Sequence, residues 1–209
     1  MNKGHKATLF VISAPSGAGK TSLVRALVAK LDELRLSISH TTRPPRPDDK
    51  EGEDYFFVDK NHFKTMVQDE AFLEHATIYG YYYGTAKHWV FDQLKWGNDV
   101  ILEIDWQGAR QIRKLFPPAK LIFILPPSAG ALRERLMKRQ QDTAAVIDQR
   151  LAFAHDEMVH YREFDYILVN DDFDKALKDL VTIVHAERLQ LDVQEEKLAP
   201  LLADLLKKQ

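Results

Sequence analysis

The sequence predicts an α/β fold with a mostly parallel sheet flanked by helices, because strand-like runs alternate with helical patterns along 209 residues. Several of these runs are apolar throughout, as expected for strands covered by helices on both faces. A chain of this length suits one domain with small insertions. The predicted central strands are Leu9–Ser13, Leu36–His40, Val100–Asp105, Leu121–Leu125 and Tyr166–Asn170.

The composition is that of an ordinary globular protein, with 45% hydrophobic and 29% charged residues. A formal charge of −2 argues against a nucleic-acid partner, and the lack of cysteine fits a reducing compartment. The first apolar stretch is already assigned to a strand, so we expect no secretory signal. No run approaches the roughly 20 apolar residues of a membrane span. We therefore expect a cytoplasmic protein without a membrane partner, either a monomer or a homo-oligomer.

Directly after the first strand, the chain reads S-A-P-S-G-A-G-K-T-S, which is the pattern of a phosphate-binding loop. Gly17 and Gly19 allow backbone N–H groups to point at phosphate oxygens, and the positive end of the following helix favours the same anion. Lys20 is expected to reach the β- and γ-phosphates, and the Thr21 hydroxyl to hold Mg²⁺. Ala14 replaces the usual first glycine, which requires ordinary backbone angles there. The sequence thus predicts binding of a nucleoside triphosphate, with contacts from Ala14, Pro15, Ser16, Gly17, Ala18, Gly19, Lys20 and Thr21.

Residues 41–85 interrupt the alternation with aromatic, β-prone stretches between Gly and Pro turns, which predicts a small antiparallel insertion with its own sheet. At its start, prolines hold Arg43 and Arg46 in a stiff extended segment. Arginine forks bind phosphate oxygens at two points and stay charged, so this segment is a candidate anion clamp. Tyr55 and Tyr83 are candidate hydroxyl donors to the same anion. The alternative is a pair of solvated loop arginines.

The remaining segments are read as a lid, a helix and a tail. Arg135–Arg150 is basic and short of apolar anchors, which is typical of a mobile lid. A salt-bridged helix face is the alternative there. An apolar stripe from Phe173 to Val184 predicts a helix capped by Asp171 or Asp172. The leucines of residues 195–208 predict a short amphipathic helix, interrupted early by Pro200. Docking on the core is favoured, and a partner site is the alternative.

Seven segments together resemble the guanylate kinase family of bacterial type: A-P-S-G-A-G-K-T, S-H-T-T-R-P-P-R, G-E-D-Y-F-F-V, F-L-E-H-A, Y-Y-G-T, I-D-W-Q-G and V-N-D-D. The resemblance implies the fold of P-loop nucleoside monophosphate kinases. It also implies transfer of the γ-phosphoryl group of ATP to GMP, and by expectation to dGMP. The implied divisions are a core at 7–40 and 86–191 with a lid near 135–150, a mixed α/β GMP-binding insertion at 41–85, and a helical tail at 192–209.

The resemblance also implies roles for individual residues. The GMP phosphate is assigned to Arg43, Arg46, Tyr55 and Tyr83, and the guanine to Ser39, Glu74, Thr85 and Glu103. The catalytic cations are assigned to Lys20, Arg46, Arg135, Arg139 and Arg150. Asp105 is expected to orient Mg²⁺ through water, and Asn170 and Asp171 to lie beside the adenine. Two positions depart from the family pattern: Glu103 stands where many members have Asp, and Gln140 where many have Gly.

The choice of guanine has a physical basis in the carboxylate at Glu74. Guanine presents N1–H and an exocyclic amine as donors, whereas an ionised carboxylate only accepts. Adenine has an acceptor at N1, so the same carboxylate would face a lone pair. Two alternatives stay open. One is a peptide-binding scaffold module of guanylate-kinase type, although such modules usually have eroded phosphate loops. The other is a kinase of the same scaffold that acts on a different phosphorylated acceptor.

Overall fold

The computed structural model describes residues 6–138 and 144–207 and contains two β-sheets. The pairing register of the larger sheet sets Ile12 opposite Glu103 and Ser13 opposite Phe123. All its strands are parallel, so their carboxyl ends meet at one edge, and the predicted parallel sheet is confirmed. Its strand order is β2 (Leu34–Ser37), β7 (Asp99–Glu103), β1 (Leu9–Ser13), β8 (Lys120–Leu125) and β9 (Tyr166–Val169).

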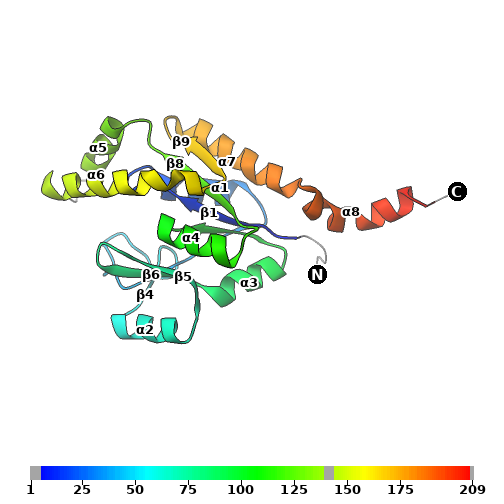
Figure 1. The fold of residues 1–209 in the computed structure, drawn as a ribbon, viewed down its shortest axis with the longest axis horizontal. Coiled ribbons are helices and arrows are strands. Elements are labelled where there is room, and N and C mark those ends of the chain that lie inside the picture. Colours follow the sequence, from blue (N-terminus) through cyan, green and yellow to red (C-terminus); the bar gives the residue numbers. More distant parts are fainter. Residues whose placement is uncertain (1–5, 139–143, 208–209) are drawn as a thin grey trace.

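Helices cover both faces of this sheet (Figure 1). Side chains alternate along a strand, so β1 contributes to two cores at once. Phe10 and Ile12 join one buried cluster, and Leu9 and Val11 join the other. The helices in the first cluster are α1 (Lys20–Lys30) and α7 (Phe173–Arg188), and those in the second are α3 (Lys87–Lys95) and α4 (Trp106–Leu115).

The second strand differs from its prediction, Leu36–His40. The observed strand begins at Leu34, which pairs with Asp99 and is fully buried. His40 lies instead in the second sheet. Pairing with β7 decides this register, because a local apolar pattern does not say where the chain leaves one sheet for another. The other predicted central strands differ from the observed ones by no more than two residues at an end.

The predicted insertion forms the second sheet, which Figure 1 shows below the larger one. Phe63 of α2 (Lys60–Gln68) packs on the rings of Phe72 and Tyr82, with centroids 4.6 and 5.5 Å apart. The sheet is mixed rather than purely antiparallel, because β3 and β4 run parallel. Its strand order is β4 (Phe56–Phe57), β3 (His40–Thr41), β6 (Tyr81–Ala86) and β5 (Phe72–Ile78).

The predicted lid segment falls on two helices, α5 (Ala129–Lys138) and α6 (Ala144–Met158), and a 3₁₀ helix, Val159–Glu163, follows them. The expected shortage of apolar anchors is wrong at Leu136, which is fully buried, and further apolar residues flank the segment on both sides. Leu132 and Leu136 of α5 pack with Leu151 and Ala154 of α6 in a small buried cluster. Helical spacing places these residues on facing sides, so the two helices hold each other by hydrophobic contact.

The tail prediction is partly wrong. Asp172 caps α7 as expected, accepting a 2.7 Å hydrogen bond from the Lys175 N–H. The last helix, α8 (Leu191–Leu205), begins earlier than predicted and continues through Pro200, where exposure lets water satisfy the carbonyl that proline leaves unpaired.

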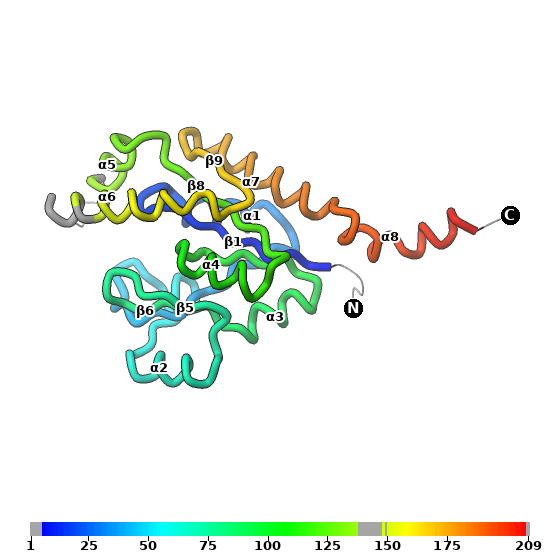
Figure 2. Tube along the Cα trace, viewed as in Figure 1, coloured from blue at the N-terminus to red at the C-terminus, as the bar shows by residue number. Residues whose placement is uncertain are grey.

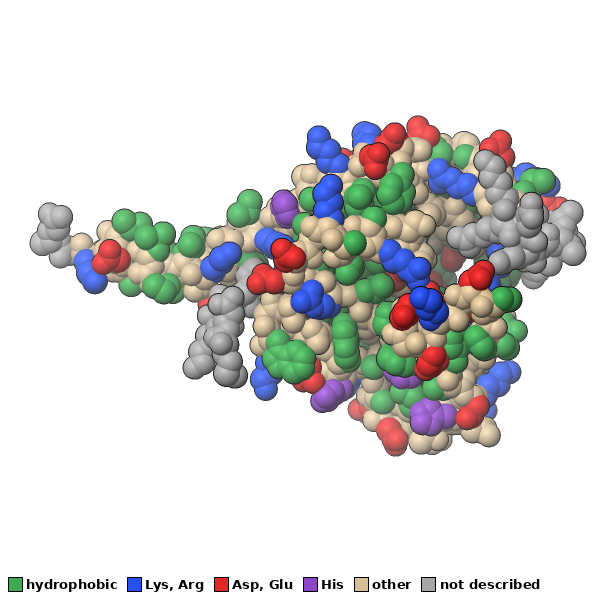
Figure 3. All heavy atoms as spheres, turned by 180° about the vertical axis from the view of Figure 1, so that it is seen from behind, with side chains coloured by type: hydrophobic (Ala, Val, Ile, Leu, Met, Phe, Trp, Pro, Cys, Tyr) green, Lys and Arg blue, Asp and Glu red, His purple; other side chains and the backbone are tan. Residues whose placement is uncertain are grey.

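The helix also does not dock along its length. Val193 is buried, whereas Leu201 and Leu205 are 52% and 68% exposed. Figure 2 shows α8 leading away from the body of the molecule, and Figure 3 shows apolar side chains on the surface of this helix. Among the helices of the described residues, none has the length and apolar character needed to cross a membrane.

Candidate active site

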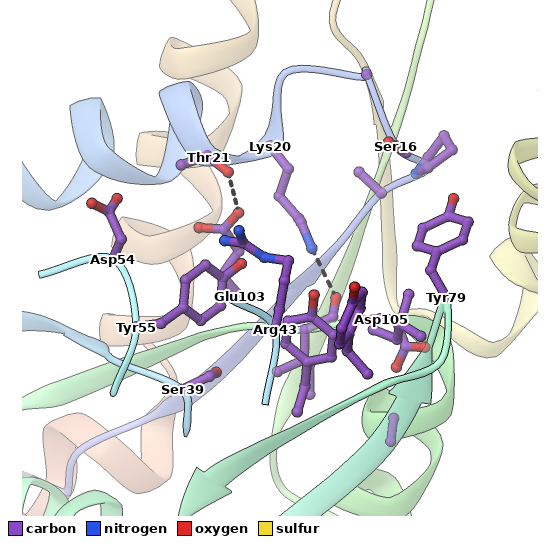
Figure 4. A pocket seen from close by; sticks show the side chains of 18 of the residues that line it. Ser16, Lys20, Thr21, Ser39, Arg43, Asp54, Tyr55, Tyr79, Glu103 and Asp105 are labelled. Carbon is purple, nitrogen blue, oxygen red and sulfur yellow. Dashed lines mark hydrogen bonds between the residues drawn. The ribbon is translucent and has the colours of Figure 1, made fainter. Parts of the chain in front are cut away.

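One cavity of about 880 Å³ opens where the carboxyl edge of the larger sheet faces the second sheet (Figure 4). Ligands of open α/β sheets bind at this edge, because loops at the strand ends converge there. Most of the predicted site residues line the cavity. These are Ala14, Pro15, Ser16, Gly17, Gly19, Lys20, Thr21, Ser39, Arg43, Arg46, Tyr55, Glu74, Tyr83, Glu103, Asp105 and Arg150.

The phosphate-binding loop has the predicted geometry. Gly17 and Gly19 have φ of 92° and 90°, angles that favour glycine. A Cβ at Gly19 would lie 2.4 Å from Nδ2 of Asn170, so packing also requires glycine there. Ala14 does not have a positive φ, so alanine can stand here in place of the usual first glycine of the loop. Helix α1 has no side-chain cap, so its first N–H groups are left for an anion.

Lys20 and Thr21 point from α1 toward the end of β7 (Figure 4). The Lys20 ammonium donates a 3.1 Å hydrogen bond to the carbonyl oxygen of Ile104. The Thr21 hydroxyl donates a 2.5 Å hydrogen bond to Oε1 of Glu103. Glu103 therefore lies against the threonine of the phosphate loop. A hydroxyl and a carboxylate side by side offer the hard oxygen ligands that Mg²⁺ prefers.

The predicted anion clamp lies across the cavity from this loop. The Arg43 guanidinium is 5.2 Å from the ring centroid of Tyr55, whose ring lies 5.8 Å from that of Tyr83. Burial, with the nearby Glu103 carboxylate, raises the pKa of Tyr55 to about 12, so its phenol remains a hydrogen-bond donor. The Arg43 guanidinium also pairs with Asp49 at 2.8 Å.

Asp49 was not anticipated from the sequence, although an aspartate after the Pro-rich segment is a typical turn residue. Burial alone would raise its pKa, but hydrogen bonds from the Arg46 N–H and the Arg43 side chain lower it. The carboxylate thus stays charged and holds the loop that carries both arginines. Ser39 lies at the cavity wall, where its carbonyl accepts a 2.9 Å hydrogen bond from the Phe56 N–H.

Glu74 is the most deeply buried acid of the cavity, with 3% of its surface exposed. Thr85, directly opposite on β6, donates a 2.5 Å hydrogen bond to its Oε1. Gly108 of α4 lies against the other oxygen, where a Cβ would come within 2.4 Å. Burial raises the pKa of Glu74 to about 7, and the nearby Asp105 carboxylate contributes in the same direction. Thr85 itself lies behind Glu74, outside the cavity lining.

Asp105 both caps a helix and lines the cavity, a combination that the sequence analysis did not predict. The strand ends at Glu103, and Asp105 caps α4 by accepting a 3.0 Å hydrogen bond from the Gly108 N–H. Its side chain also lines the cavity and is 8% exposed. A single hydrogen bond therefore ties the cavity to the glycine that makes room for Glu74.

Several predicted residues lie behind the phosphate loop rather than in the cavity. Asn170 is buried and donates a 2.7 Å hydrogen bond to the carbonyl of Ala18. The Arg135 guanidinium donates to the Asn170 carbonyl at 2.8 Å, and its Nη1 is buried without a hydrogen-bond partner in the described structure. Asp171 is exposed. Arg139 lies outside the described residues.

Helix α6 contributes two cavity residues that the sequence analysis did not single out, Phe153 and Glu157. They follow the predicted Arg150 at helical spacing, and all three line the cavity. Phe153 contacts the ring of Tyr79, at the turn of the second sheet, edge to face with centroids 5.0 Å apart. Spacings of three and seven residues were the available signal, but many surface helices show the same pattern.

A phosphate-binding loop that faces a second anion site across one cavity defines a phosphotransferase of the P-loop nucleotide kinase class. The family model described as Guanylate kinase matches residues 6–187, and the chain belongs to this family. It is 68% identical over 205 residues to a guanylate kinase of Coxiella burnetii (strain RSA 493 / Nine Mile phase I), covering 98% of this chain and 100% of that protein.

Further relatives have the same description. A guanylate kinase of Legionella pneumophila (strain Lens) is 50% identical over 209 residues, with 100% of both chains covered. The crystal structure of guanylate kinase from Anaplasma phagocytophilum superposes with a TM-score of 0.76 at 30% identity, covering 92% of each chain. The expected fold class is therefore confirmed by sequence and by structure.

The burial of Glu74 predicts a pH-dependent cost to stability. Below pH 4.5 the carboxyl is protonated in both the folded and unfolded states; between pH 4.5 and about 7 only the unfolded state ionises, so stability falls as pH rises. Glu74→Gln removes this cost, and its gain in free energy of unfolding should be about 2.5 kcal/mol larger at pH 8 than at pH 5. Urea unfolding at both pH values measures it.

A matched control for this experiment is Glu53→Gln, at a glutamate whose side chain is 67% exposed. Its effect on the free energy of unfolding should be small and nearly independent of pH. An equal effect of Glu74→Gln at pH 5 and pH 8 would show that the folded protein keeps Glu74 at an ordinary pKa.

Proposed function

We propose that this protein catalyses transfer of the γ-phosphoryl group of ATP to GMP, which yields ADP and GDP, and that dGMP is a further acceptor. One observation carries the proposal: a phosphate loop and an arginine–tyrosine anion clamp share one cavity with a buried carboxylate, Glu74. Membership of the guanylate kinase family supports the same reaction. The intact loop residues Lys20 and Thr21 favour an enzyme over a peptide-binding module of this fold.

The acceptor phosphate is proposed to bind Arg43, Arg46, Tyr55 and Tyr83. Arg43 already has an anionic partner, Asp49, so a phosphate of higher charge can share or take over its donors. The two phenols, 5.8 Å apart between ring centroids, add neutral donors beside it. Such a clamp fixes the acceptor oxygen for in-line attack, which is the main task of the protein in phosphoryl transfer.

The guanine is proposed to bind between Ser39 and Glu74, with Thr85 orienting the Glu74 carboxylate through their 2.5 Å hydrogen bond. Burial raises the pKa of Glu74, whereas guanine supplies two N–H donors that favour the ionised form. Adenine lacks this pair of donors at the same edge. The energy lost on burying the charge without a ligand is therefore recovered only with the correct base.

The geometry supports an exchange of the roles that the family resemblance implies for Glu103 and Asp105. Glu103 contacts the Thr21 hydroxyl at 2.5 Å, so we propose that it lies at the Mg²⁺ site rather than at the guanine. Asp105 raises the pKa of Glu74 by its charge and is 8% exposed in the cavity wall. We propose that Asp105 accepts from the guanine amine. Through-water contact of Asp105 with Mg²⁺, as the family resemblance implies, is the alternative.

The donor is proposed to bind the loop from Ala14 to Thr21. The oxygen ligands available fit Mg²⁺, which typically uses one or two protein groups together with substrate phosphates. Bound there, the cation would neutralise charge on the transferring phosphoryl group. Lys20, Arg135, Arg139 and Arg150 are proposed to supply further positive charge to the triphosphate, and Asn170 and Asp171 to flank the adenine.

The division of the chain is proposed as a core at 7–40 and 86–191, with a lid near 135–150, a GMP-binding insertion at 41–85, and a helical tail at 192–209. The start of β3 at His40 and the end of β6 at Ala86 support these limits of the insertion. We propose a cytoplasmic location, which the lack of cysteine in the sequence supports.

The first test is a substrate panel. With ATP and Mg²⁺, a coupled assay of ADP formation should show rapid turnover with GMP, measurable turnover with dGMP, and rates lower by at least about a hundredfold with AMP and UMP, because unpaired buried polar groups penalise the wrong base. Equal rates with AMP and GMP would refute the role of Glu74. Turnover only with an acceptor that is not a nucleotide would refute the proposed substrate.

Arg43→Ala tests the acceptor clamp. The loss of charge-assisted hydrogen bonds to phosphate should raise KM for GMP about 10- to 100-fold, while the Kd for ATP changes less than about twofold. Steady-state kinetics and calorimetry measure these quantities. The control is Lys64→Ala, which removes an exposed positive charge from the same insertion. Unchanged GMP kinetics in Arg43→Ala would remove Arg43 from the site.

Glu103→Gln and Asp105→Asn test this exchange of roles. If Glu103 lies at the metal, Glu103→Gln should raise the Mg²⁺ concentration for half-maximal rate by at least about fivefold, with a smaller change in KM for GMP. Asp105→Asn should show the opposite pattern. The reverse outcome for the two variants would restore the roles implied by the family resemblance.

A further inference from the structure

Glu157 of α6 contacts the phosphate-binding loop, and none of the steps proposed above uses it. Its Oε2 accepts a 3.1 Å hydrogen bond from the backbone N–H of Ser16. The side chain lines the same cavity as Lys20 and Thr21. Backbone N–H groups of this loop are the ligands of phosphate oxygens. A carboxylate of the chain itself therefore takes one of the positions that the loop offers to an anion.

The surroundings of Glu157 indicate which end of the loop it occupies. The Lys20 ammonium favours its charged form, whereas burial, the largest effect, and the Asp105 carboxylate raise its pKa. Lysine at this position of a phosphate loop reaches the β- and γ-phosphates. Asp105 and Tyr79 line the same cavity, and Tyr79 lies between β5 and β6 of the second sheet, where it contacts Phe153, one turn before Glu157. Glu157 thus lies at the end of the loop that faces the acceptor, where the terminal phosphate of a donor belongs.

The position of Glu157 is also fixed by its helix. Phe153, one turn earlier, packs on Tyr79 with ring centroids 5.0 Å apart, and Leu151 and Ala154 pack on α5. Arg150, two turns before Glu157, lines the same cavity. Residues seven apart on a helix share a face, about 10 Å apart along its axis. One face of α6 therefore presents a carboxylate and an arginine to the same cavity.

A nucleoside triphosphate competes with Glu157 for the Ser16 N–H, whereas a nucleoside diphosphate does not. The β-phosphate belongs over the start of α1, at Gly19 and Lys20, where the helix has no side-chain cap. A γ-phosphate extends further, to the N–H that Glu157 occupies. Two anions cannot share one donor at hydrogen-bond distance without strong repulsion in a partly buried site. The carboxylate must then leave, whereas a diphosphate lets it stay.

We propose that Glu157 is a specificity-determining residue of the donor site, because a nucleoside triphosphate must displace its carboxylate from Ser16 whereas a diphosphate need not. The inference rests on the proposed ATP site at the phosphate loop. It gives the enzyme a way to distinguish its donor from the spent nucleotide: the contact opens when a γ-phosphate is present and forms again after that phosphate has been transferred.

The test is calorimetric titration of the full chain in excess Mg²⁺ with ADP and with the non-hydrolysable triphosphate adenylyl imidodiphosphate. Glu157→Gln keeps an oxygen that can accept from Ser16 and removes only the charge. It should tighten binding of the triphosphate analogue by at least about fivefold, a typical size for coupling between two binding events, and change the Kd of ADP by less than about twofold.

The matched control is Asp156→Asn, which removes the same charge from the neighbouring position of α6, where the side chain is 80% exposed. It should leave both dissociation constants nearly unchanged, because exposed charges are screened by salt. Glu157→Ala is the second variant; it should shift the ratio of the two affinities in the same direction as Glu157→Gln. Thermal unfolding of each variant establishes that it is folded before titration.

The proposal is overturned if Glu157→Gln and Glu157→Ala bind the triphosphate analogue with unchanged or weaker affinity while the wild type binds both nucleotides. It is also overturned if Asp156→Asn tightens analogue binding equally, because the effect would then be one of net charge. A wild type that binds neither nucleotide would overturn the proposed ATP site itself, and this inference with it. The first two outcomes leave the proposed reaction intact.

Discussion

The parallel pairing of β1 with β7 is the constraint on which the site depends. It sets Ile12 opposite Glu103, so the phosphate loop that follows β1 and the acids that end β7 emerge side by side. The 3.1 Å hydrogen bond from Lys20 to Ile104 and the 2.5 Å hydrogen bond from Thr21 to Glu103 both follow from this register. A slip of one residue would turn Glu103 to the other face and separate it from the threonine.

The cavity concentrates negative charge in a place where two anionic substrates must meet. Seven carboxylate side chains line it: Asp48, Asp49, Asp54, Glu74, Glu103, Asp105 and Glu157. Burial raises the pKa of Glu74 and of Glu157, because a buried carboxylate loses its hydration. The ionised form of each depends on nearby hydrogen-bond donors, such as the Thr85 hydroxyl for Glu74 and the Ser16 N–H for Glu157. Stability is therefore reduced locally at the positions where specificity is needed.

Local sequence patterns were sufficient to predict features that need a particular backbone conformation or a particular order of residue types. The glycines of the loop, with φ near 90°, were predictable because few other residues adopt such angles. Arg43 and Arg46 stood out because the prolines between and after them give a stiff extended segment. Asp172 was a predictable cap because capping needs only residues three apart. Tertiary contacts overruled the pattern at His40, which leaves the larger sheet for the second one.

By itself, the sequence determined that this is an α/β protein with a phosphate-binding loop and a pair of arginines among prolines, because these depend on residue types at short spacing. Glu74 was singled out through the family resemblance and not through its spacing. Only the tertiary structure decided that Glu103 meets Thr21, that Asp49 holds Arg43, and that Glu157 reaches Ser16 from 141 residues away. Such contacts depend on how strands and helices pack. No local spacing encodes which distant side chain will fill a given hydrogen-bond position.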